Sequence, residues 1–204
     1  MDRRTDRRTR ARAGAAAVAM GTVLALGGLQ GASAGTRTAE DVSASAEVCV
    51  GERPEGSLAG HGAPEDTPLD RTLGYVDKVA YGRHAEVFTG LVVDEDAGTA
   101  DIYRIPSVAF DSDVCRAAEK GVTLRLHDRD INEADLTALS DRIADDMGRW
   151  DGTFDMRQVG LDGTGHVHIG VDDPVTAEPI LRKAYGEANA TYLRVTHAPQ
   201  AYLQ

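Results

Sequence analysis

Two stretches of the sequence, separated by 66 to 69 residues, carry the same order of secondary-structure signals. Each has two short runs rich in β-branched residues around a glycine-containing turn, then a helical pattern that opens near a proline, then a final short apolar run. Chance could match a few positions, but the shared order favours a duplicated strand–strand–helix–strand module. The matched positions are Phe88 with Phe154, Gly98 with Gly165, Pro106 with Pro174, and Leu124-Arg125 with Leu193-Arg194.

Two further helical patterns accompany these modules. A short helix precedes the first module, where Leu73, Val76 and Val79 fall at helical spacing. A longer helix over 132–147, capped by Asn132, joins the two modules. The remaining predicted elements are strands 87–93 and 99–105, helix 108–119, strand 122–127, strands 154–159 and 166–171, helix 176–185 and strand 192–195.

These elements predict an α+β fold in which helices pack on a mixed or mainly antiparallel sheet. Two adjacent strands joined by a short turn pair antiparallel, whereas the helical crossover favours a parallel neighbour. A single module has little apolar surface with which to cover its sheet. We therefore expect the two modules to share one hydrophobic core.

The N-terminus carries the signals of a cleavable secretory signal peptide over residues 1–34. A basic segment with six arginines precedes a low-polarity run over 13–29, and Ala32-Ser33-Ala34 fits the small-x-small cleavage pattern. The predicted cleavage lies between Ala34 and Gly35. The alternative is an uncleaved membrane anchor, but a span needs about 20 strongly apolar residues. The sequence therefore predicts a secreted, extracellular protein with no stable membrane insertion after cleavage.

Composition divides the rest of the chain into three parts. Residues 35–70 contain three prolines and five glycines without apolar periodicity, which is typical of a flexible arm. The α+β domain is predicted over 71–198, and residues 199–204 form a short tail.

The chain has two cysteines, Cys49 in the predicted arm and Cys115 in the domain. An even number of cysteines in an oxidising compartment favours a disulfide, which would tie the arm to the domain. Two independent thiols are the alternative.

Charge restricts the class of partner. Residues 35–204 carry 16 lysines and arginines against 31 aspartates and glutamates, a net charge of −15. Phosphate backbones and anionic lipid surfaces repel such a chain, so nucleic acid is not a predicted partner.

Two patterns resemble metal-binding motifs. The run Asp94-x-Asp96-x-Gly98 has the start of a calcium loop but lacks its later ligands, so a hairpin turn is the favoured interpretation. His166 and His168 lie two apart on one strand face, with no further ligand close in sequence. Nucleophile, phosphate-loop and dinucleotide motifs are lacking, so we predict no catalytic residue, metal or cofactor.

Three segments resemble the propeptide domains of secreted actinobacterial serine proteases of the α-lytic type. They are Glu86–Asp94 with its hairpin, Asn132–Leu139, and the strand pair that ends at Gly170-Val171-Asp172. The resemblance implies a folding helper that assists its protease and inhibits it afterwards. No protease follows Gln204, so the resemblance implies a free-standing version.

The predicted function is therefore a secreted, non-enzymatic binding domain whose partner is a secreted protease or another exported protein. The tail would lie extended in the partner's cleft, with Tyr202, Leu203 and Gln204 as binding residues. A frayed terminus is the alternative for the tail. The alternatives for the whole protein are a structural protein of the cell envelope and a small secreted hydrolase with an unmarked site.

Overall fold

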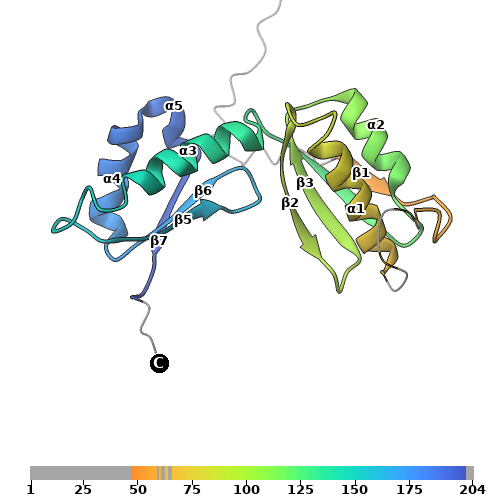
Figure 1. Ribbon diagram of the computed structural model, residues 1–204, viewed down its shortest axis with the longest axis horizontal. Helices are drawn as coiled ribbons and strands as arrows, with labels where there is room; N and C mark the ends of the chain where they lie inside the picture. The colour runs from red at the N-terminus through yellow and green to blue at the C-terminus, as the bar shows by residue number, and fades with distance from the viewer. Residues whose placement is uncertain (1–46, 59, 61–62, 64–65, 201–204) are drawn as a thin grey trace, which may run out of the picture. The chain divides into compact units, whose positions relative to one another are not determined.

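We describe a computed structural model of the chain that covers residues 47–58, 60, 63 and 66–200 (Figure 1). The predicted signal peptide, its cleavage site at Ala34 and Gly35, and the predicted binding residues Tyr202–Gln204 lie outside these residues. No helix in the described part of the chain is long and apolar enough to cross a membrane.

The described part of the chain is mixed α+β, as predicted, and contains five helices and two mixed sheets. The first sheet has the order β1-β4-β3-β2 and the second has the order β5-β6-β7. The strands are β1 (Glu47–Val50), β2 (Phe88–Asp94), β3 (Thr99–Arg104), β4 (Thr123–Asp128), β5 (Met156–Leu161), β6 (Val167–Val171) and β7 (Leu193–His197). The helices are α1 (Pro68–Ala80), α2 (Val108–Ala117), α3 (Glu133–Asp145), α4 (Pro174–Tyr185) and α5 (Glu187–Ala190).

The two modules have the same topology. In each, the first two strands pair antiparallel and the third strand pairs parallel with the second: β2-β3-β4 in one module and β5-β6-β7 in the other. The register makes Leu124 of β4 equivalent to Leu193 of β7, as predicted. Ile102 and Ile169 occupy equivalent positions and pair with Leu126 and Val195, which lie two residues after these leucines.

One predicted correspondence is wrong. The register makes Phe88 equivalent to Met156 rather than to Phe154, since each of Phe88 and Met156 immediately precedes an irregularity in its antiparallel ladder. Phe154 lies before β5 and is still buried in the core of the second module.

The expectation of a shared core is also wrong, because each module buries a separate hydrophobic cluster. Val76 from α1 and Phe110 from α2 lie in the first cluster, whereas Leu139 from α3 and Leu181 from α4 lie in the second. A helix thus precedes the three-stranded part of each module: α1 contacts α2 in the first module, and α3 contributes to the same hydrophobic cluster as α4 in the second (Figure 1). Two helices supply enough apolar surface to cover one face of a three- or four-stranded sheet.

The described part of the predicted arm packs against the first module. Strand β1 pairs antiparallel with β4, and Cys49 forms the predicted disulfide with Cys115 of α2. The chain then turns so that Leu58 is buried. At Gly51 a Cβ atom would lie 1.9 Å from the carbonyl oxygen of Glu119, so only glycine fits this close approach.

A fully buried carboxylate, that of Glu119, holds this turn in place. Its oxygens accept hydrogen bonds from the backbone N–H of Leu58 at 2.8 Å and of Gly56 at 3.0 Å. The Arg71 guanidinium donates to the same carboxylate through Nη2 at 2.8 Å and Nε at 3.2 Å. Burial alone would raise the pKa of Glu119, but the hydrogen bonds from Arg71, Leu58 and Gly56 outweigh it and lower the pKa below its usual value.

Candidate partner-binding edge

The two modules share a topology, but their sheets differ in one respect. In the first sheet β4 lies between β3 and β1, so both of its edges are paired. Its counterpart β7 pairs only with β6 among the described strands. No described strand therefore fills, beside β7, the position that β1 fills in the first module.

Backbone groups of β7 point toward this open side. The Tyr192 carbonyl accepts from Val167 N–H at 2.8 Å, and Ala198 N–H donates to the Val171 carbonyl at 2.8 Å, so these residues face β6. Because a parallel ladder uses alternate residues of each strand, the N–H and C=O groups of Leu193, Val195 and His197 face the other way.

Side-chain packing keeps β7 extended. Leu193 is fully buried and Val195 packs against the second core, which fixes the strand on its helix-covered face. At the end of the strand Arg157 donates from Nη1 to the Ala198 carbonyl at 2.6 Å. The edge is thus a rigid strand whose direction is held up to the start of the tail.

The open face of this sheet carries the two histidines that the sequence singled out. His168 lies 2.7 Å from Thr196 Oγ1 and 3.3 Å from Gln158 Nε2, whereas His166 contacts Arg194 and Thr164. The two imidazoles therefore have separate partners. The described residues contain no group of three or more side chains that could hold a metal ion.

The acidic run in the first module closes a hairpin. Asp94 accepts from Ala97 N–H at 3.0 Å, and Gly98 takes a positive φ of 62° between β2 and β3. These contacts fit the turn interpretation of the Asp94–Gly98 run.

Two histidine–aspartate pairs were not found from the sequence. His84 Nε2 lies 2.7 Å from Asp113, and His127 Nε2 lies 2.7 Å from Asp101. The partners are 29 and 26 residues apart and come from different elements, so no local spacing could reveal them. No described serine, threonine or cysteine is hydrogen-bonded to either imidazole, so a nucleophilic triad is not assembled in the described part of the chain.

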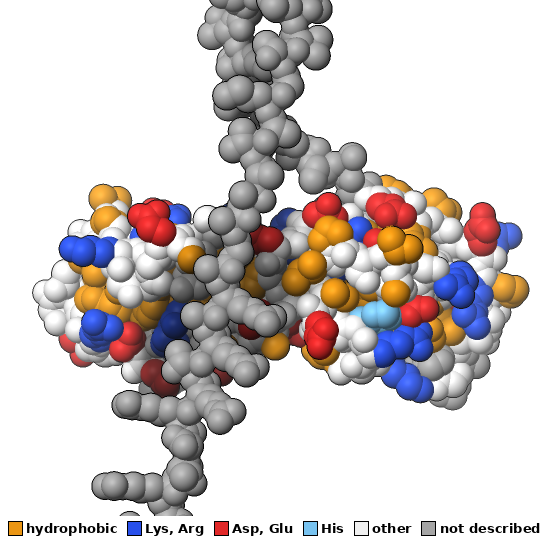
Figure 2. Space-filling view, turned by 90° about the horizontal axis from the view of Figure 1, so that it is seen from above, with side chains coloured by type: hydrophobic (Ala, Val, Ile, Leu, Met, Phe, Trp, Pro, Cys, Tyr) orange, Lys and Arg blue, Asp and Glu red, His pale blue; other side chains and the backbone are white. Residues whose placement is uncertain are grey.

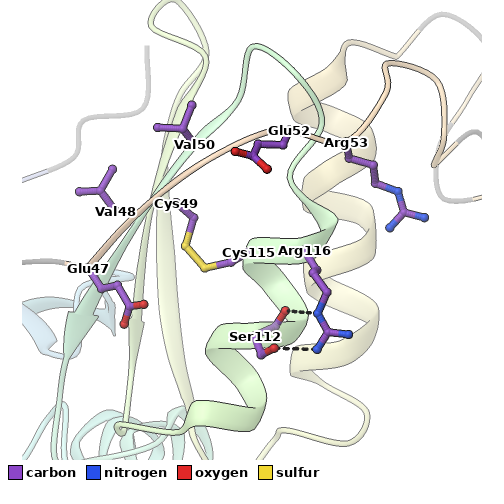
Figure 3. A pocket seen from close by; sticks show the side chains of 9 residues that line it. All are labelled: Glu47, Val48, Cys49, Val50, Glu52, Arg53, Ser112, Cys115 and Arg116. Carbon is purple, nitrogen blue, oxygen red and sulfur yellow. Dashed lines mark hydrogen bonds between the residues drawn. A yellow bond between two sulfur atoms is a disulfide. The ribbon is translucent and has the colours of Figure 1, made fainter.

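A pocket of about 610 Å³ opens between β1 and α2, beside the disulfide (Figure 3). Its lining contains one hydroxyl, that of Ser112, which Arg116 contacts at 2.6 Å within the same helix. None of the lining residues is a histidine that could take a proton from this hydroxyl. The residues that line this pocket therefore do not pair a nucleophile with a histidine base, as many hydrolase sites do.

The charge is distributed rather than concentrated on the face seen in Figure 2. Acidic and basic side chains are interspersed there among hydrophobic ones, although the described domain is acidic as a whole.

A scan against protein-family models, a search of curated proteins and a search of solved structures found no match to this chain. The resemblance to α-lytic-type propeptide domains remains a prediction. Function is therefore inferred from the geometry of the described residues.

Proposed function

We propose that this protein is an exported, non-enzymatic binding domain that adds a strand of a secreted partner protein to the open edge of β7. The predicted partner is a secreted protease, which the domain inhibits or helps to fold. The observation that carries this proposal is the open position beside β7, which β1 occupies in the duplicated module.

The first module supplies the geometry of the added strand. There β1 runs antiparallel to β4 over four residues, from Glu47 opposite Leu126 to Val50 opposite Thr123. A partner strand of similar length, antiparallel to β7, would meet the backbone groups of Leu193, Val195 and His197. Strand addition of this kind derives affinity from main-chain hydrogen bonds and specificity from alternate side chains.

Two further features support the proposal. The predicted signal peptide and the Cys49–Cys115 disulfide are both typical of exported proteins. The tail follows directly after β7, so a protein whose strand lies on this edge would also be within reach of the tail.

The test is inhibition of serine proteases purified from the culture medium of the producing organism. We expect His197→Pro to weaken inhibition of the partner protease at least about ten-fold, because proline removes an N–H that faces the open edge while the ladder to β6 is kept. Deletion of residues 199–204 should weaken inhibition as well. The readout is the inhibition constant, with circular dichroism to confirm that each variant is folded.

Val50→Pro is the matched control. Val50 is also on an edge strand with its backbone directed outward, and its side chain is 68% exposed, but it lies in the first module. The substitution Val50→Pro should leave inhibition of the partner protease unchanged. Equal inhibition by the wild type and His197→Pro would overturn strand addition at β7. Sedimentation with envelope material, with no protease inhibited, would instead favour the structural-protein alternative.

A further inference from the structure

A second pocket, of about 600 Å³, lies where the segment after β4 meets the second module. Its volume is that of a small-molecule site. Two arginines and one histidine contribute to its wall, in a chain that is strongly acidic overall. The lining residues are Asp128, Arg129, Asp130, Gly165, His166, Thr191, Tyr192 and Arg194.

Uncharged groups hold Arg129 in place. Its Nε donates to the Thr164 carbonyl at 2.7 Å and its Nη1 to the Asp128 carbonyl at 2.7 Å. Its guanidinium lies 4.6 Å from the centre of the Tyr103 ring. A Cβ atom at Gly165 would come within 2.8 Å of Nε, so glycine at this positive φ allows the side chain to cross the turn.

Arg194 is held by His166. Its Nη2 lies 2.7 Å from His166 Nε2, and the other ring nitrogen, Nδ1, lies 3.3 Å from an Asp162 oxygen and 3.1 Å from Thr164 Oγ1. Since arginine can only donate, Nε2 must accept, and the imidazole is neutral with its proton on Nδ1. Burial and the nearby Arg194 both lower the pKa of His166, which agrees with a neutral imidazole.

The carboxylates of the pocket wall have other partners. Asp128 pairs with Arg104, and Asp130 accepts a hydrogen bond from the Tyr192 hydroxyl. Within the described residues neither Arg129 nor Arg194 forms an ion pair with a carboxylate. Two fixed guanidinium groups thus flank one neutral imidazole with no anion paired to them.

We propose that this pocket binds an organic carboxylate, with Arg129 and Arg194 as its ligands. A guanidinium presents paired N–H donors whose spacing matches a carboxylate, and both arginines keep donors that their protein contacts do not use. His166 is a positioning residue because it acts through Arg194. The site uses the side chains of Arg129 and Arg194, whereas strand addition uses the outward backbone groups of β7, so different variants test the two proposals.

Succinate is the probe, titrated at constant ionic strength into the ¹⁵N-labelled domain, with neutral succinamide as the matched control. We expect saturable shifts of the Gly165, His166 and Arg194 amides with succinate and none with succinamide. Arg129→Gln and Arg194→Gln should each weaken succinate binding about ten-fold. Arg149→Gln, which removes an exposed arginine that is paired with Asp146 and does not line the pocket, should have no effect.

Two further titrations identify the source of the carboxylate. A short peptide with a free C-terminus that binds more tightly than succinate, while its amidated form does not bind, would assign the site to a polypeptide carboxylate. Tighter binding of succinate would assign it to a free acid. Equal affinity for inorganic phosphate, equal shifts with succinamide, or unchanged affinity in both folded arginine variants would overturn the proposal.

Discussion

Glu119→Gln should lower the free energy of unfolding by about 3–5 kcal/mol, the range expected when one partner of a buried ion pair is removed. The substitution keeps the volume of the side chain but removes its charge. Arg71 would then lack the carboxylate that it contacts at this site, and the amide nitrogen would present donors to the N–H group of either Gly56 or Leu58. Urea denaturation at pH 7, followed by circular dichroism, measures the change.

Glu119 should also make the stability of the protein depend on pH. Because the folded-state pKa of Glu119 is lowered from its ordinary value of 4.5, its contribution to stability is present above that pH and is lost as the pH falls through the folded pKa. The difference between the wild type and Glu119→Gln should therefore shrink in acid. Glu178→Gln, in an exposed pair with Arg182, should change stability by less than about 1 kcal/mol. A difference that stays constant from pH 7 to pH 3 would contradict the assignment.

The double substitution Cys49→Ala and Cys115→Ala should lower the free energy of unfolding by about 4 kcal/mol. The bridge spans 66 residues, so its loss greatly increases the freedom of the unfolded chain. It also leaves β1 attached to the sheet by its ladder with β4 alone. Denaturant unfolding of the oxidised wild type and the double variant measures the effect.

Reduced wild-type protein is the control for that variant. It should unfold at the same denaturant concentration as the double variant, because both lack the cross-link and differ only in two small side chains. If the free energy of unfolding fell by less than about 1 kcal/mol both in the double variant and in the reduced wild type, the disulfide would not stabilise the fold by restricting the unfolded chain.

Local patterns were sufficient to predict the elements of the fold. Short β-branched runs and glycine turns predicted the hairpins, and the spacing of Leu136, Leu139 and Ile143 predicted α3. The two cysteines predicted the disulfide because an oxidising compartment favours a bridge and two cysteines allow only one intramolecular pairing. These signals depend on neighbours along the chain, and the sequence contains them directly.

Long-range packing was not predictable in the same way. The first helix of each module was recognised as a helix but not as a member of the repeat, since the sequences of α1 and α3 share little beyond their periodicity. Glu119 lacks any local sign of burial, because its partners Arg71 and Leu58 lie 48 and 61 residues away.

For the candidate sites too, local features could be predicted from the sequence and long-range contacts could not. Strand β7 was predicted, but its open edge becomes visible only when β1 is seen beside β4. His166 was singled out for its spacing with His168, whereas its actual partner Arg194 lies 28 residues away on the adjacent strand. Which residues meet across a sheet depends on register, and register was not set by any local motif.

Two independent hydrophobic clusters have a consequence for how the molecule comes apart. A chain with two cores need not melt in a single all-or-none step, because one half can lose its order while the other keeps it. Both the cross-link and the buried carboxylate belong to the first half. Amide hydrogens of β6 should therefore exchange through openings to which reduction makes no difference, while those of β4 should exchange faster once the cross-link is broken.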